Sequence, residues 1–373
     1  MKVIRATDLS SISQFFESDV MRFNPVRLGI ARKRRLLNKK GFAELVGVTQ
    51  HTVGRWERGE VDPALENIQA FTRVLGFPSL YFYGGDLDEP ESANFRSQTS
   101  MSAAVRDASL AAGALGFMIS DWVEEKFELP VIFVPDLHTF EPEEAARVLR
   151  AEWQLGERPV SNMIHLLESK GVRVFSLAQN TVKVNAYSLW RNSKPYVFLN
   201  TFKTAESSRF DAAHELGHLV LHQDGRATGR EAEDQANRFA SAFLMPRADL
   251  MAVLPRASYI GELIEAKARW KVSVAALAHR MHKLGLMSDW RYRDICIEIA
   301  NRGFNKTEPR PILREASVVW QKVLKALWAE RMTPAHIARE LQIPEEELNG
   351  LIFGITAAGE RPTERAPLSV VED

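Results

Sequence analysis

The stretch AAHELGHLVLH, residues 212–222, places two histidines four residues apart inside an otherwise apolar helical pattern. Histidines at this spacing lie on one face of an α-helix, about 6 Å apart along its axis, so both imidazoles can reach one metal ion. Glu215 sits about 100° round the helix from His214, where it can act on a water molecule instead of the ion. The alternative is a helix whose charged residues only face solvent. The apolar flanks favour a buried helix with His214 and His218 as metal ligands.

A catalytic zinc site needs a third protein ligand and a fourth position left to water. His222 lies another four residues along the helix, about 12 Å from His214 along the axis, so one ion cannot bridge the two. We therefore expect a structural or surface role for His222. The third ligand should come from another segment of the chain.

The stretch EAEDQANRFASAFLMP, residues 231–246, has an apolar stripe at helical spacing and ends at a proline. Glu233 lies about 60° from the centre of that stripe, whereas Glu231 and Asp234 face water. Glu233 is therefore the predicted third ligand. An alternative is that Glu233 is a partly buried residue in a salt bridge with an arginine such as Arg209. Asn237, one turn later, could hydrogen-bond a histidine ligand.

This ligand set predicts a reaction class. Zinc held by His214, His218 and Glu233 would activate water and polarise a carbonyl group, with Glu215 as the general base. Peptide-bond hydrolysis is the expected reaction. The strand PYVFLN, residues 195–200, could offer a sheet edge to which an extended peptide adds.

Composition limits the remaining possibilities. The 373 residues include 48 basic and 48 acidic side chains and one cysteine, Cys296, so the chain has no intrachain disulfide and suits a reducing compartment. The first 20 residues do not resemble a secretory signal. The longest uncharged run, residues 108–120, is shorter than the ~20 apolar residues that span a bilayer. We expect a soluble cytoplasmic protein that does not contact a membrane.

The order of helical segments, short apolar runs and turn residues along the chain predicts an α+β, mostly helical fold. Short apolar runs, at 131–134, 171–177, 181–190 and 195–200, are expected to form a small sheet just before the metal-binding helix. The expected order is a helix-turn-helix bundle at 21–85, a linker and connecting helix at 86–130, a metallopeptidase-like domain at 131–305, a helical region at 306–355 and a disordered tail at 356–373.

Residues 21–62 carry ten basic side chains against four acidic ones, which gives this segment a net charge of +6. In AELVGVTQHTVGRWERG, residues 43–59, Gly47 permits a tight turn and Thr49 can cap the next helix. The side chain types at the front of that helix can reach base edges in a major groove, and basic residues before it can contact phosphates. The predicted DNA-binding residues are Gln50, His51, Thr52, Arg55, Arg32, Arg34 and Lys39. A small helical bundle for protein contacts is the alternative.

These motifs resemble two known families. Residues 27–83 resemble the Xre/Cro-type helix-turn-helix family, most clearly in the run 43–59, which implies binding to double-stranded DNA, usually as a dimer. Residues 95 to about 305 resemble the ImmA/IrrE metallopeptidases, through FRS at 95–97 and the runs 149–175, 209–222 and 233–246. That resemblance implies a zincin-like fold of the gluzincin type, with zinc held by His214, His218 and Glu233 and with Glu215 as the catalytic glutamate. It also implies cleavage of helix-turn-helix repressors in stress or mobile-element responses.

Two functions stay open from the sequence. The first is a DNA-bound zinc peptidase that cleaves a regulatory protein, which could be a repressor, an antitoxin-like protein or the chain itself. The second is a non-proteolytic transcription regulator whose zinc domain senses a ligand or a partner. Residues 332–354 again resemble a helix-turn-helix but have few basic residues, which favours dimerisation or packing against the peptidase-like domain.

Overall fold

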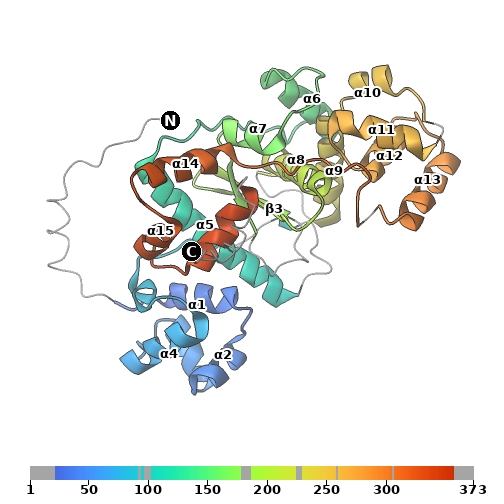
Figure 1. Cartoon of the computed structure of the whole chain (residues 1–373). Coiled ribbons are helices and arrows are strands. Elements are labelled where there is room, and N and C mark those ends of the chain that lie inside the picture. Colours follow the sequence, from blue (N-terminus) through green and yellow to red (C-terminus); the bar gives the residue numbers. More distant parts are fainter. Residues whose placement is uncertain are drawn as a thin grey trace, which may run out of the picture.

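The computed structural model describes residues 22–90, 94–95, 102–177, 186–223, 229–257, 259–304 and 306–356. The fold is α+β and mostly helical, as predicted, with one four-stranded sheet among the described residues. Figure 1 shows three groups of helices around this sheet. The predicted tail at 356–373 lies outside the described residues except for Thr356. Within the described ranges, no helix combines the length and apolar character that a membrane span requires.

The sheet has the strand order β1-β3-β4-β2. Strands β3 and β4 form an antiparallel hairpin whose turn residues, Asn192 and Ser193, have φ values of 49° and 60°, as two-residue hairpin turns require. Strand β2 pairs with β4 in parallel, and β1 pairs with β3 in antiparallel. The strands are β1 (Asn94–Phe95), β2 (Arg173–Ser176), β3 (Ala186–Arg191) and β4 (Lys194–Leu199).

Two strand predictions are wrong. Residues 131–134 form no strand, and the Phe133 amide donates to the Lys170 carbonyl oxygen in a loop. The run 195–200 contains β4, which is hydrogen-bonded on both sides, to β3 and β2. Because an interior strand has no unpaired edge, β4 cannot accept a further strand from a substrate.

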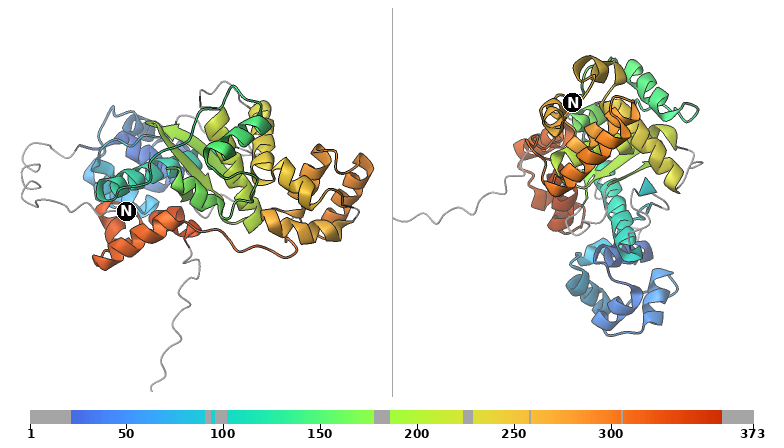
Figure 2. Two further views of the ribbon diagram at one scale, coloured as in Figure 1. Left: turned by 90° about the horizontal axis from the view of Figure 1, so that it is seen from above. Right: turned by 90° about the vertical axis from the view of Figure 1, so that its right-hand side faces the viewer.

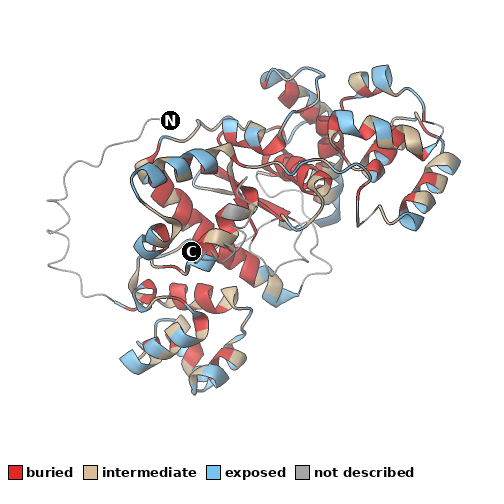
Figure 3. Cartoon of the chain, in the orientation of Figure 1, coloured by how far each residue is buried: buried red, intermediate tan, exposed pale blue. Residues whose placement is uncertain are grey.

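Each face of the sheet is covered by one long helix. Helix α5 (Ala103–Lys126) covers the face to which Tyr187 and Tyr196 point, and the Tyr187 hydroxyl donates to the Ser109 carbonyl oxygen at 2.8 Å. Gly116 of α5 allows the close approach, because a Cβ there would lie 2.8 Å from the Phe198 ring. Helix α8 (Ala205–Leu221) covers the other face. Buried residues concentrate on these two helices and the sheet (Figure 3).

The remaining helices of this part extend the layer that contains α8. Helix α9 packs along α8 and also contacts α6. The group α11–α13 lies at the opposite end of the molecule from the N-terminal helices (Figure 2). The bounds are α6 (Pro142–Glu152), α7 (Met163–Ser169), α9 (Gly229–Leu244), α10 (Arg247–Val253), α11 (Ile260–Trp270), α12 (Val274–Lys283) and α13 (Asp289–Asn301).

The C-terminal helices pack against the sheet and α7. They are α14 (Val318–Ala329), α15 (Pro334–Glu340), α16 (Glu345–Ile352) and the 3₁₀ helix η3 (Phe353–Ile355). The Glu168 carboxylate of α7 accepts the Val318 and Val319 amides at the start of α14, and the Trp320 indole donates to the Val174 carbonyl oxygen of β2 at 2.9 Å. Of the two arrangements expected for this region, packing against the part of the chain that contains the sheet is the one found.

The N-terminal helices enclose their own aromatic core. Gly47, with φ of 74°, ends α2, and the Thr49 hydroxyl accepts the Thr52 amide at 3.1 Å to cap α3, as the sequence predicted. Phe71 packs against Phe42 and Trp56 at ring-centroid distances of 5.5 and 5.2 Å. The elements are α1 (Pro25–Arg34), α2 (Lys39–Val46), α3 (Gln50–Glu57), α4 (Leu65–Leu75) and the 3₁₀ helix η2 (Ser79–Tyr83).

A buried charge cluster docks α1 on the rest of the chain. The Glu347 carboxylate of α16 is 3% exposed and accepts from Arg34 Nε at 2.8 Å and from Arg35 Nη1 at 2.6 Å. Arg34 also donates to the Ala108 carbonyl oxygen of α5 at 3.1 Å. Moving α1 away from α16 would break these charge-assisted hydrogen bonds and leave the Glu347 carboxylate without its partners, which costs free energy. The pairs therefore favour one relative position of α1 and α16.

Replacing Glu347 should loosen this docking. In Glu347→Gln the two arginines lose their counter-charge, and we expect unfolding to become easier by about 3 kcal/mol, since breaking a buried pair costs roughly that much. Amide exchange in α1 should also become faster. The matched control is Glu346→Gln, because Glu346 is exposed and forms no ion pair among the described residues. Equal stability and exchange in the two variants would contradict this role for Glu347.

Candidate metal centre

Strand β3 fixes the rotation of α8 about its own axis. The Ser188 hydroxyl donates to the Glu215 side-chain Oε2 at 2.7 Å and lies 3.2 Å from the Glu215 carbonyl oxygen. Two residues along the strand, the Trp190 indole donates to the Leu219 carbonyl oxygen at 3.2 Å. Because residues two apart on a strand share one face, both contacts hold the same side of the helix. The histidine face of α8 is thereby turned toward α9.

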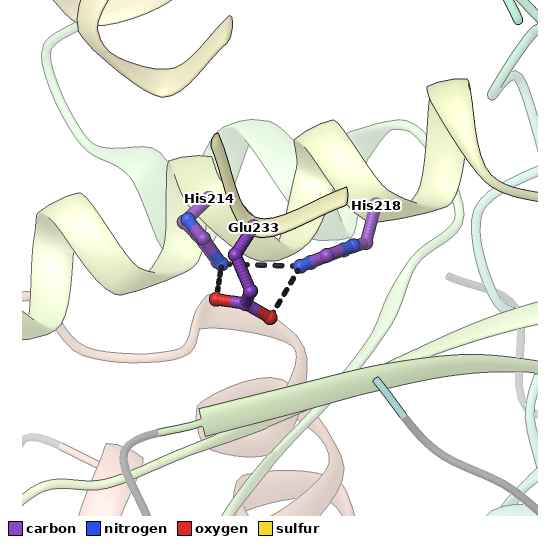
Figure 4. A group of neighbouring side chains, drawn as sticks. All are labelled: His214, His218 and Glu233. Atoms are coloured by element: carbon purple, nitrogen blue, oxygen red, sulfur yellow. Dashed lines mark hydrogen bonds and ion pairs between the residues drawn. The ribbon is translucent and has the colours of Figure 1, made fainter. Parts of the chain in front are cut away.

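Three side chains from α8 and α9 converge on one point. His214 and His218 project from one face of α8 toward the Glu233 carboxylate of α9 (Figure 4). The two imidazole Nε2 atoms are 3.1 Å apart. The distances from His214 Nε2 and His218 Nε2 to the carboxylate oxygens of Glu233 are 3.4 and 3.5 Å.

This donor set fits a tetrahedral zinc ion. Bonds of about 2.0–2.1 Å in a tetrahedron place ligand atoms roughly 3.3 Å apart. The two Nε2 atoms are 3.1 Å apart, and each lies 3.4 or 3.5 Å from one of the two Glu233 oxygens, Oε2 for His214 and Oε1 for His218. With a single oxygen of Glu233 as the third ligand, all three ligand atoms lie within 4.8 Å of one another. Two imidazoles and one carboxylate are also a ligand set that zinc hydrolases use. Within the described part of the chain, this is the one group of three such side chains close enough to share an ion.

Each histidine is held through its other ring nitrogen. Asn237 Oδ1 of α9 lies 3.1 Å from His214 Nδ1, which is the contact that the sequence led us to expect. His218 Nδ1 lies 2.9 Å from His222 Nδ1. His222 is buried and stands outside the three-residue group, so it has a structural place next to a ligand.

The alternative partner for Glu233 is engaged elsewhere. Arg209 is fully buried, pairs with Glu315 and donates to the Val160 carbonyl oxygen. Burial alone raises the pKa of Glu233, but hydrogen bonds and charge interactions with His214 and His218 outweigh burial and hold that pKa at about 2. The Glu233 carboxylate is therefore ionised at neutral pH, which is the form that binds a cation.

A polar cleft adjoins this group. It has a volume of about 680 Å³ and is lined by residues of α8, α9 and α12. Asn237 both lines the cleft and contacts His214, and Asp211, one helical turn before His214, lines it as well. The cleft therefore reaches the immediate surroundings of the metal ligands and is large enough for a segment of polypeptide.

The predicted base-reading residues lie on or beside the surface of α3. Gln50, His51 and Arg55 are exposed. Thr52 is half-buried, and its hydroxyl is 2.9 Å from the Thr49 hydroxyl, so part of its hydrogen-bonding capacity is used within the helix cap.

The predicted phosphate contacts are placed differently. Arg32 is buried in an ion pair with Glu57 at 2.6 Å, and Arg34 is buried in the pair with Glu347. Since buried, paired guanidinium groups cannot reach DNA without breaking those pairs, neither residue suits a phosphate contact. Lys39 remains 38% exposed, 3.1 Å from the Glu57 carboxylate. The basic composition of this segment thus overstates the charge that it offers to a ligand.

The sequence did not indicate two contributors to the site. Ser188 contacts Glu215 from a strand 27 positions away, and Gln235 contacts His222 at 2.8 Å. For His222 the sequence analysis rejected a ligand role and expected a structural or surface role, and the structure places it buried against His218. A histidine four residues after His218 has the spacing of a neighbour on the same helix face, and this spacing was the available signal.

Comparisons with known proteins agree with this division of the chain. Residues 28–82 match the helix-turn-helix family, and residues 167–282 match the family of the IrrE N-terminal-like domain, the Peptidase M78 family. None of the curated proteins compared with the chain matches it. The second match contains α8, α9 and the three converging side chains. In chain order, a segment similar to helix-turn-helix domains is therefore followed by a segment similar to the IrrE N-terminal-like domain of the Peptidase M78 family.

Proposed function

We propose that this chain is a DNA-binding regulator whose metallopeptidase-like domain hydrolyses a peptide bond in a regulatory protein. The observation that carries the proposal is that the ionisable side chains at the centre of α8 occupy two different positions. His214 and His218 turn toward Glu233, whereas Glu215 lies outside that group with its carboxylate held by Ser188. A purely structural metal site has no use for such a carboxylate next to its ligands.

The residues of the chain would act as follows. His214, His218 and Glu233 would hold zinc, which when bound polarises a carbonyl group and activates water. Glu215 would accept a proton from the attacking water and later deliver a proton to the leaving amine nitrogen. The hydrogen bond from Ser188 would keep the Glu215 carboxylate in one orientation during both transfers. The polar cleft would hold the substrate chain beside these groups.

The domain order supports a target that functions near DNA. A helix-turn-helix domain brings the metallopeptidase-like domain to a regulatory site, which raises the local concentration of that domain around other proteins bound there. We therefore propose a repressor, an antitoxin-like protein or a second copy of this chain as the substrate. A homodimer on double-stranded DNA is the assembly that such a domain most often forms.

Removing a ligand should remove the metal. Purified protein should hold about one zinc ion per chain, as the three-donor group requires. His214→Ala and Glu233→Ala should each retain less than about a tenth of it, since loss of a ligand costs more than the roughly 10–100-fold affinity that a supporting hydrogen bond provides. Elemental analysis after dialysis against a weak chelator measures the content. Asp234→Ala, which changes the exposed neighbour of Glu233, should keep its zinc. Full retention in Glu233→Ala would show that the wrong carboxylate was chosen.

Removing the proposed base should separate metal binding from catalysis. Glu215→Gln should keep its zinc and lose about 10²–10⁴-fold of its rate, because general-base catalysis contributes that much. The zinc-loaded wild type and variant are each incubated with an extract of the source cells, and new protein N-termini are identified by mass spectrometry. Termini that form only with the wild type identify the substrate. If both proteins yield the same termini, Glu215 is not the base, and the sensing function becomes the better explanation.

DNA binding should be carried by α3. Arg55→Ala should weaken binding to the preferred duplex by about 1–3 kcal/mol and affect random duplex much less, if Arg55 reads a base. Lys39→Ala should weaken binding to both duplexes alike, as a phosphate contact does. Duplexes selected from a random pool are compared with scrambled ones by fluorescence anisotropy at physiological salt. Removing zinc should leave these affinities unchanged. A wild type with no sequence preference would point to a protein-docking role for this domain.

A further inference from the structure

A chain of hydrogen bonds runs from α9 to the second histidine ligand through a third histidine. Gln235 Oε1 lies 2.8 Å from His222 Nε2, and His222 Nδ1 lies 2.9 Å from His218 Nδ1. The far nitrogen of His218, Nε2, faces Glu233. His218 and His222 are both buried. Two groups, His222 and Gln235, are therefore linked in series behind one metal ligand.

The direction of each hydrogen bond follows from the glutamine. The Gln235 amide nitrogen donates to the Glu231 carboxylate at 3.5 Å, so its carbonyl oxygen is the atom that faces His222. A carbonyl oxygen only accepts, so His222 carries its proton on Nε2 and keeps a lone pair on Nδ1. His218 must then donate from Nδ1, which leaves the lone pair of His218 on Nε2.

That tautomer is the one that a metal ligand needs. A histidine coordinates through an unprotonated nitrogen, and the group that accepts from its other nitrogen decides which one that is. His214 has the same tautomer through one direct hydrogen bond, because Asn237 Oδ1 accepts from its Nδ1. Two side-chain amide groups of α9, those of Asn237 and Gln235, thus determine the tautomers of the two histidine ligands of α8. The same helix also supplies Glu233.

We propose that His222 and Gln235 are positioning residues, which hold His218 in the tautomer and ring orientation that bind the metal. This inference rests on the zinc centre of the proposed function and adds two residues to it. His222 acts as a relay: it accepts from the ligand and donates to Gln235. Burial strengthens the effect, because a hydrogen bond in a low-dielectric site is stronger and an unsatisfied ring nitrogen there is costly.

The first test is zinc affinity, measured by competition with a chromophoric chelator on the full-length protein. Gln235→Leu and His222→Ala should each bind zinc about 10–100-fold more weakly, the range found when a hydrogen bond to a ligand is lost. Gln235→Glu should retain affinity, because its carboxylate still accepts from His222. Arg238→Leu is the matched control on α9, since Arg238 is exposed and pairs with Glu141 outside the centre. Thermal unfolding of each apo protein shows that the variants fold.

The second test reads the protons directly, which a merely structural role would not change. In zinc-loaded wild type labelled with ¹⁵N-histidine, NMR should show a proton on Nδ1 of His218 and on Nε2 of His222. In Gln235→Leu the preference of His222 for Nε2 should weaken. Unchanged zinc affinity in both Gln235→Leu and His222→Ala, or a His222 proton on Nδ1 in wild type, would overturn the relay. Wild type that binds no zinc would instead contradict the metal centre itself.

Discussion

The structure depends on the burial of a polar helix. Helix α8 is enclosed over nearly its whole length, yet it carries charged and ionisable side chains in almost every turn. Buried groups of this kind are tolerated only with partners, and here each partner comes from a different element. Satisfying all of them at once leaves α8 one position and one rotation. The pairs are Glu206–Lys267, Arg209–Glu315, Asp211–Lys203, His214–Asn237 and Glu215–Ser188.

Local spacing made part of this site predictable. Two histidines four apart identify a ligand face whatever surrounds the helix, and the apolar stripe of α9 selects Glu233 over its acidic neighbours. Partners that depend on tertiary pairing could not be found in this way. Ser188 meets Glu215 only because β3 crosses α8 at that register. The runs 131–134 and 195–200 show the same limit, since short apolar runs do not reveal whether a segment is a loop, an edge strand or an interior strand.

Charge counting was least reliable in the N-terminal domain. The segment 21–62 has a net charge of +6, and this excess suggested a row of phosphate contacts. Two of its arginines instead neutralise Glu347, more than 300 residues later in the chain, and Arg32 neutralises Glu57 within the domain. Composition gives the charge that a segment carries, but the fold determines how many of its charged side chains form ion pairs within the protein. The turn and cap were predictable because they depend on a few adjacent residues.

The domain that would read DNA and the metal centre are joined by a short path of side-chain contacts. Arg34 donates to the Ala108 carbonyl oxygen of α5, and the next carbonyl along, that of Ser109, accepts from Tyr187 of β3. The residue after Tyr187 is Ser188, which holds Glu215. Such a path transmits an effect only if one of its elements has two stable positions. The docking of α1 combines packing along α5 with the ion pairs to Glu347, and it is where the N-terminal helices meet this path. An effect of DNA on the metallopeptidase-like domain would have to pass through this interface.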